Sequence, residues 1–247
     1  YLKQFILFLY ILKSLLKFCV FSLKKINNNY KFNNKNIFFS HLNNVEHINY
    51  KNDFYFGSIP SWLKEKYLII FNNNTKKNFY EIQKALKNKQ FLIPEFLGFK
   101  EEYEILITYF KLINYFRSIN ISDKVFKQEL HYQLYNRGII YNLRKLFFFK
   151  KILNSNVKKV FLTYEGHYSE AFIIKYSNKL KIKTFAYNHS YFYDFQKTYR
   201  NLHYKNFTPD VVFLTGPYIK KKMKFFPNQK IFIIGSNKVV LNKSNNV

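Results

Sequence analysis

The residues best suited to acid–base chemistry are a glutamate and a histidine that each follow an apolar run. Glu165 comes directly after the run 157–163, and His189 comes shortly after the run 182–187. If the two runs form neighbouring parallel strands, their carboxyl ends share one edge of the sheet, so both side chains could meet in one pocket. Histidine is the usual general base near neutral pH, and a nearby carboxylate orients it or raises its basicity. We therefore expect Glu165 and His189 to be catalytic.

Small or polar residues follow the other predicted strands as well. A small or polar residue at each of five strand ends predicts a binding cleft along this edge, because ligands of such sheets bind beyond the carboxyl ends of the strands. The residues expected to contact substrate are His41, Glu170, Asn188, Ser190, Gly216, Gly235 and Ser236.

Three of these residues have a second interpretation. Glu170 stands in the first turns of a predicted helix, where it could instead balance the helix dipole or form a buried pair with lysine. The Gly235-Ser236 turn could present backbone N–H groups to a phosphate, or it could be an ordinary turn.

His167 and His203 could be solvated loop residues, and His131 is expected to be structural. The His and Cys spacings do not predict a metal site.

Strands and helices alternate in the C-terminal half of the chain. From residue 157 onward, strands are predicted at 157–163, 182–187, 209–216 and 230–236, with helices at 169–180 and 217–226. Continuous apolar strands separated by helices are typical of a parallel sheet covered on both faces, which is a doubly wound α/β fold.

The N-terminal half is expected to contribute further strands and two long helices. Short buried strands are predicted at 37–42 and 66–72, and a third at 90–99 is weakened by Pro94. The stretches 101–116 and 124–153 are predicted to form one helix each.

The composition indicates a folded protein with a strongly basic surface. The 247 residues are 48% hydrophobic and 21% aromatic, and the formal net charge is +27. Only four of the 41 basic residues are arginine, the residue that specific nucleic-acid readers favour. Joint enrichment of Lys, Asn, Ile, Phe and Tyr is typical of AT-rich codon usage, although such a surface would still attract anionic lipid or phosphorylated substrates. The single cysteine, Cys19, rules out a disulfide within the chain.

The N-terminal segment 1–27 has a basic amphipathic pattern. Its apolar run 5–12 is too short to span a bilayer, and Lys13, Lys17 and Lys24 share one helical face. This pattern predicts either a helix lying on an anionic membrane surface or a helix packed on its own domain. Lysines within the apolar region make a cleaved signal peptide a poorer interpretation.

Four stretches together resemble one protein family. They are YEGHYSEAF (164–172), IKTFAYNHS (182–190), TPDVVFLTG (208–216) and IFIIGSNK (231–238). Their order and spacing resemble bacterial surface-polysaccharide (capsule or lipopolysaccharide) biosynthesis glycosyltransferases of the GT-B type. The matching residues are Glu165, Tyr168, Glu170, Tyr187, His189, Pro209, Asp210, Gly216, Gly235 and Ser236. Asn188 stands where this family usually has glutamine, and Tyr168 where tryptophan is common.

The resemblance implies an organisation and an activity. It implies that the amphipathic segment 1–27 is followed by a Rossmann-like acceptor-side domain at 28–235, and then by a linker at 236–247 leading to a donor domain that is missing. The enzyme would transfer a sugar from a nucleotide-sugar to a lipid- or glycan-linked acceptor, with no metal or other cofactor. His189 would be the base or a phosphate contact, Glu165 its partner or an acceptor ligand, and His41 an acceptor contact. The protein would be cytoplasmic and peripheral on the inner membrane.

Two other functions are compatible with the sequence. One is a binding module for single-stranded nucleic acid, which would place lysines and aromatic rings together on one exposed face. The other is a non-catalytic scaffold at the membrane with a degenerate α/β domain. The nucleic-acid module gives no role to the polar groups at the strand ends. Nucleic acid is accordingly not the expected partner.

Overall fold

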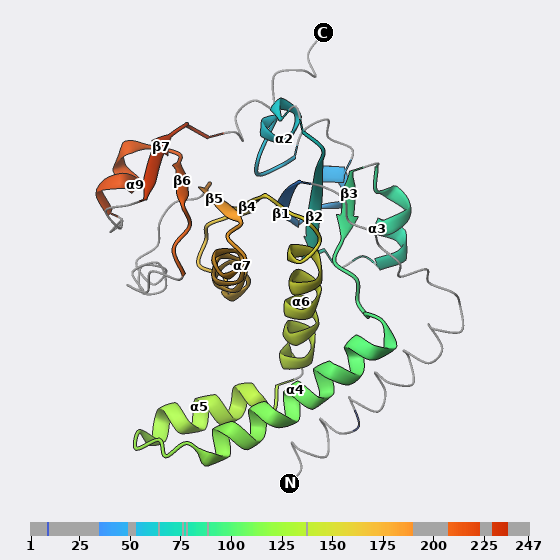
Figure 1. Cartoon of the computed structure of the whole chain (residues 1–247), viewed down its shortest axis with the longest axis vertical. Helices are drawn as coiled ribbons and strands as arrows, with labels where there is room; N and C mark the ends of the chain where they lie inside the picture. Colours follow the sequence, from blue (N-terminus) through green and yellow to red (C-terminus); the bar gives the residue numbers. More distant parts are fainter. Residues whose placement is uncertain are drawn as a thin grey trace. The chain divides into compact units, whose positions relative to one another are not determined.

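Seven short and mostly apolar segments form one sheet in which all neighbouring strands are parallel (Figure 1). The computed structural model describes residues 9, 35–48, 53–63, 65–75, 77, 79–87, 89–136, 138–189, 207–222 and 229–236. The strands are β1 (Asn36–Leu42), β2 (Tyr67–Asn73), β3 (Gln90–Leu92), β4 (Lys159–Thr163), β5 (Lys183–Asn188), β6 (Val211–Leu214) and β7 (Lys230–Ile233). The predicted α/β fold with a parallel sheet is therefore confirmed.

The order of the strands is β3-β2-β1-β4-β5-β6-β7. The chain builds outward from β1 to β3 and then returns to the other side of β1 with β4. Rossmann-like sheets have this order, and their ligands bind where it reverses, beyond the carboxyl ends of the strands. In this sheet the reversal lies between β1 and β4, so the ends of these two strands are the first place to look for a site.

Helices form most of the connections between the strands. They are η1 (Val45–Ile48), α2 (Ile59–Trp62), α3 (Phe79–Ala85), α4 (Phe99–Ser118), α5 (Lys124–Leu134), α6 (Gly138–Leu153), α7 (Tyr168–Lys179) and α9 (Pro217–Lys222). The single helix predicted at 124–153 is wrong, because α5 ends at Leu134 and α6 begins at Gly138. The side chain of Asn136 accepts a hydrogen bond from the Gly138 N–H at 2.8 Å, which competes with continued helix.

A stack of phenylalanine rings packs on one face of the sheet. Phe38 on β1 stacks on Phe161 of β4 with ring centroids 4.3 Å apart, and Phe161 stacks on Phe185 of β5 at 4.6 Å. Phe213 on β6 extends the stack at 6.1 Å from Phe185. Aromatic pairs between neighbouring strands stabilise a sheet beyond their burial alone. The stack thus holds β1, β4, β5 and β6 in the register that brings their carboxyl ends together.

The described chain divides into two compact units, of which the first is helical. It contains residues 94–148, and the second contains the sheet, within 35–93 and 149–236. In the helical unit Arg144 pairs with Glu102 at 2.8 Å with both side chains buried, and Glu102 also accepts the Leu97 N–H at 3.0 Å. The Tyr109 hydroxyl donates to the Leu134 carbonyl at 3.1 Å, which ties α4 to the end of α5.

Asp123 caps the N-terminus of α5. Its carboxylate accepts the Phe126 N–H at 3.0 Å, and its backbone is extended, as an N-cap requires. We expect Asp123→Ala to destabilise α5 by about 1 kcal/mol. Amide hydrogen exchange would report faster exchange in residues 124–134, while the strands would exchange as in the unchanged protein. Unaltered exchange throughout α5 would contradict this assignment of the cap.

The N-terminal amphipathic helix predicted at 1–27 lies outside the described residues, apart from Leu9. Among the helices of the described ranges, none combines the length and the apolarity needed to cross a lipid bilayer.

Candidate functional site

Glu165 and His189 meet at the carboxyl edge of the sheet, as their positions in the sequence predict. Glu165 Oε1 lies 2.9 Å from Nδ1 of His189 and also accepts the backbone N–H of His189 at 3.3 Å. The ring nitrogen and the carboxylate are close enough for an ion pair but are not aligned as a hydrogen bond. The strand ends beneath them are joined, because Tyr164 donates its N–H to Tyr187 O at 2.9 Å. Neighbouring parallel strands therefore do place the two groups side by side.

The pair is covered rather than open to solvent. The side chains of His189 and Glu165 are only 8% and 9% exposed. The ring of Tyr55 packs edge-on against His189 with centroids 4.3 Å apart, and Asn43 donates a hydrogen bond to the Tyr55 hydroxyl. Burial raises the pKa of Tyr55, and the negative charges of Asp53 and Glu165 raise it further. The pocket that the sequence predicts around Glu165 and His189 is therefore largely closed to solvent, and Tyr55 closes part of it.

The loop that carries Tyr55 is organised by Asp53. Asp53 Oδ1 accepts the N–H groups of Tyr55 and Phe56 at 2.9 and 2.8 Å, and the hydroxyl of Ser40 at 3.1 Å. Two backbone hydrogen bonds between Asp53 and Gly57 close the turn, and Gly57 adopts the positive φ of 56° that favours glycine. Burial raises the pKa of Asp53, while these hydrogen bonds and the nearby His189 oppose that effect. The loop therefore holds a buried acid and a tyrosine against the Glu165–His189 pair.

Glu170 supports the loop that positions Glu165. It is the third residue of α7, and its carboxylate reaches back to the N–H groups of Glu165, Gly166 and His167 at 2.8–3.0 Å. The Thr163 hydroxyl donates to it as well, at 3.0 Å. Burial raises the pKa of Glu170 to about 7, although each of these donors lowers it. With its oxygens used in this way, Glu170 holds the loop in place.

His41 is held by a set of neutral hydrogen-bonding groups. The amides of Asn72 and Asn74 lie 3.3 and 3.4 Å from its Nδ1, and the Thr163 hydroxyl lies 3.3 Å from its Nε2. Because the Thr163 proton goes to Glu170, Thr163 accepts from His41, so His41 carries its proton on Nε2 and accepts the amides at Nδ1. Both ring nitrogens are therefore occupied. This makes His41 a poor base, although its half-buried ring can still line a site.

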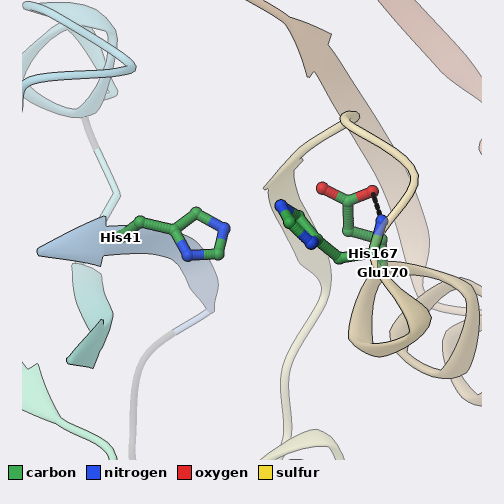
Figure 2. Close-up of side chains that lie close together, drawn as sticks. All are labelled: His41, His167 and Glu170. Atoms are coloured by element: carbon green, nitrogen blue, oxygen red, sulfur yellow. Dashed lines mark hydrogen bonds between the residues drawn. The ribbon is translucent and has the colours of Figure 1, made fainter. Parts of the chain in front are cut away.

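Figure 2 shows the ring of His41 facing that of His167 across a gap, with Glu170 on the far side of His167 and within the curve of the loop. The two ring centroids are 5.3 Å apart, and ligand atoms of His41, His167 and Glu170 lie within 4.8 Å of one another. Two histidines and a glutamate are a known zinc ligand set. Here, however, Glu170 already accepts from three N–H groups and one hydroxyl, which fill the lone pairs of a carboxylate. These three side chains in this arrangement therefore do not fit a metal ion.

The remaining predicted residues are dispersed along the same edge. Asn188 is fully buried and donates from Nδ2 to Tyr164 O at 3.2 Å. Gly216 has open space where a side chain would begin, and Gly235 has a positive φ of 79° with its carbonyl accepting the Tyr187 hydroxyl at 3.3 Å. Ser236 is exposed, and Ser190 lies outside the described residues.

Buried polar atoms that lack a hydrogen-bond partner gather at this edge. Among the described residues six such side-chain atoms occur, and four of them belong to the strand ends or the Asp53 loop. These four are Asp53 Oδ2, Asn72 Oδ1, Asn188 Oδ1 and His189 Nδ1, the last of which lies in ion-pair contact with Glu165. Buried polar groups are nearly always paired, so each of these atoms calls for a specific partner, such as a water molecule or a ligand.

Comparison with known proteins identifies no relative of this chain. No protein-family model, no curated protein and no solved structure matches it. The geometry of the site is therefore the main guide to function.

Sequence reasoning missed the residues that surround the pair. Asp53 and Tyr55 lie in the stretch DFYFG, which contains no predicted site residue, and Thr163 is the last residue of the predicted strand 157–163. One signal was present, since acids number only 14 in this basic chain and Asp53 directly precedes an aromatic cluster.

Proposed function

We propose that this chain is the acceptor-side part of a glycosyltransferase of surface-polysaccharide assembly, of the GT-B type. The observation that carries the proposal is the Glu165–His189 pair, 2.9 Å apart at the carboxyl edge of a parallel sheet with Rossmann-like strand order. The enzyme transfers a sugar from a nucleotide-sugar to a hydroxyl group of a lipid- or glycan-linked acceptor. The resemblance of the four strand-end motifs to such enzymes supports the same assignment.

In the proposed reaction His189 is the general base. Glu165 lies at Nδ1 and favours the tautomer with the proton there, which leaves the lone pair of Nε2 free to accept a proton. Nε2 takes the proton of the acceptor hydroxyl as its oxygen forms a bond to the anomeric carbon of the sugar. The bond from that carbon to the nucleotide diphosphate breaks, and the diphosphate leaves with the electron pair. Glu165 orients the ring and stabilises the imidazolium that forms.

Access to this base requires movement of the loop that carries Tyr55. Tyr55 covers His189, so an acceptor hydroxyl reaches Nε2 only when the ring of Tyr55 shifts. Closure of aromatic side chains over a site excludes water, which would otherwise compete with the acceptor as the nucleophile. The donor would be bound mostly by a second domain, and segment 1–27 with the basic surface would hold the enzyme at the cytoplasmic face of the inner membrane.

A transfer assay with the complete protein tests the proposal. A panel of radiolabelled nucleotide-sugars is incubated with lipid extracts that contain lipid-linked acceptors, and sugar incorporated into the lipid fraction is counted. We expect incorporation from at least one donor. Failure with every donor would contradict the proposal. If the protein then bound an oligonucleotide with an affinity that falls steeply with salt, the nucleic-acid-binding module would be favoured. If it bound no nucleic acid, the membrane scaffold would be favoured.

A further inference from the structure

Asp53 has an oxygen that its own loop does not explain. Oδ1 accepts all three hydrogen bonds of the turn, from Ser40, Tyr55 and Phe56. Oδ2 is buried and has no hydrogen-bond partner. Burying a charged carboxylate without compensation is strongly unfavourable. Asparagine or serine could accept the hydrogen bonds of such a turn without a buried charge. The carboxyl group at this position therefore has a second role.

The positively charged group that interacts with Asp53 is the imidazolium of His189. An attractive charge interaction with the imidazolium of His189 opposes the rise in the pKa of Asp53 that burial causes. Tyr55, whose N–H is bound by Asp53, packs its ring against that same imidazole at 4.3 Å. Loop and histidine are thus in contact through Tyr55 and coupled by charge through Asp53.

We propose that Asp53 is a positioning residue for His189: its free Oδ2 balances the imidazolium that forms when His189 accepts a proton, while Glu165 orients the ring from Nδ1. This inference rests on the proposed role of His189 as base. His189 would then work between two carboxyl groups, one at the end of β4 and one on the loop after β1. Because Asp53 also anchors the loop that carries Tyr55, Asp53 couples the charge of His189 to the position of the Tyr55 ring that packs against it.

The titratable groups around Asp53 in the described ranges include Tyr55 on its own loop, His189 after β5 and Glu165 after β4. Tyr55 is neutral at pH 7, because the ordinary pKa of tyrosine is 10.0 and burial raises the pKa of Tyr55 further. Glu165 lies against His189. His189 is therefore the group whose charge Asp53 is expected to sense.

Carbon NMR of the Asp53 carboxyl group tests this coupling without any substrate. The resonance is assigned by its loss in Asp53→Asn, and its titration is followed in the unchanged chain and in His189→Gln. We expect the pKa of Asp53 to be higher in His189→Gln, because the favourable interaction with the imidazolium is lost. His131→Gln, which changes a histidine on α5, should leave the titration of Asp53 unaltered. An equal pKa of Asp53 in the unchanged chain and in a folded His189→Gln variant would overturn the inference, and His189→Asn repeats the comparison if glutamine disturbs folding.

Activity of the complete protein provides a second readout. Asp53→Asn keeps an oxygen to accept the loop N–H groups but removes the charge, and it should lower kcat by about tenfold with little change in KM. Asp210→Asn is the matched control, since the Asp210 carboxylate accepts the N–H and the hydroxyl of Thr184 at the other end of β5, at 2.7 and 2.9 Å. Equal kcat values for Asp53→Asn and the unchanged enzyme would overturn the inference. A preserved charge coupling in a protein with no transfer activity would instead refute the proposed function alone.

Discussion

Replacement of His189 by glutamine is expected to lower the rate of sugar transfer by about 10²–10⁴-fold, the usual contribution of a general base. Glutamine has similar length and can still contact Glu165, but it has no nitrogen that accepts a proton from the acceptor hydroxyl. The loss should therefore fall on kcat, with KM for the acceptor little changed. Single-turnover transfer assays, which separate the chemical step from product release, would measure it.

The control for this result is a histidine outside the site. His131 lies on α5, where its ring packs on Tyr135 with centroids 4.6 Å apart. His131→Gln should transfer sugar at the rate of the unchanged enzyme. If His189→Gln also kept that rate, His189 would not be the base, and the mechanism given above would be wrong.

The second large effect concerns Glu170 and the stability of the fold. Burial raises the pKa of Glu170 from its ordinary value of 4.5 to about 7. The folded state therefore holds this proton more tightly than the unfolded state, and the resulting stabilisation is complete below pH 4.5. It is lost as the pH rises through 7, and amounts to about 2 kcal/mol between pH 5 and pH 8.

Glu170→Gln should remove this part of the pH dependence. Glutamine cannot ionise, so the free energy of unfolding of the variant should fall less steeply between pH 5 and pH 8. Burial also raises the pKa of Asp53, which adds a pH dependence of the same sign above its ordinary pKa of 3.8. The variant should be about 1–3 kcal/mol less stable overall, since its amide nitrogen faces backbone N–H groups of the 165–167 loop.

Urea unfolding at pH 5, 6, 7 and 8 would test this prediction. Glu129→Gln on α5 is the control, because Glu129 is exposed and bonded only to Gln133 in the described structure, at 2.7 Å. Its pH dependence should equal that of the unchanged protein. An equally steep slope in Glu170→Gln would show that Glu170 does not titrate in this range.

Much of the sheet could be predicted because its strands are local apolar runs. The runs at 157–163 and 182–187 alternate with a helix, which is enough to predict parallel neighbours and the meeting of Glu165 with His189. The gap between α5 and α6 escaped prediction, since the residues before Asn136 and after Gly138 both follow a helical pattern and the hydrogen bond from the Gly138 N–H to the Asn136 side chain leaves no clear mark in it.

The surroundings of the pair could not be predicted in the same way. They depend on β4 pairing with β1 across more than a hundred residues, a contact that no local periodicity encodes. That pairing brings Thr163 to His41, 122 residues apart in sequence, and the same strand order brings Tyr55 to His189. Glu170 was left with several interpretations because its partners are backbone N–H groups of a loop, which the sequence does not distinguish from a solvated turn.

The most direct test of the central claim is a double-mutant cycle on Glu165 and His189 in the complete protein. The transfer rate is measured for Glu165→Gln, for His189→Gln and for the double variant. If the two residues form one acid–base unit, the double variant should be no slower than His189→Gln alone, because Glu165 acts only through the ring of His189. Multiplying losses would show that the two residues act independently, which contradicts the account.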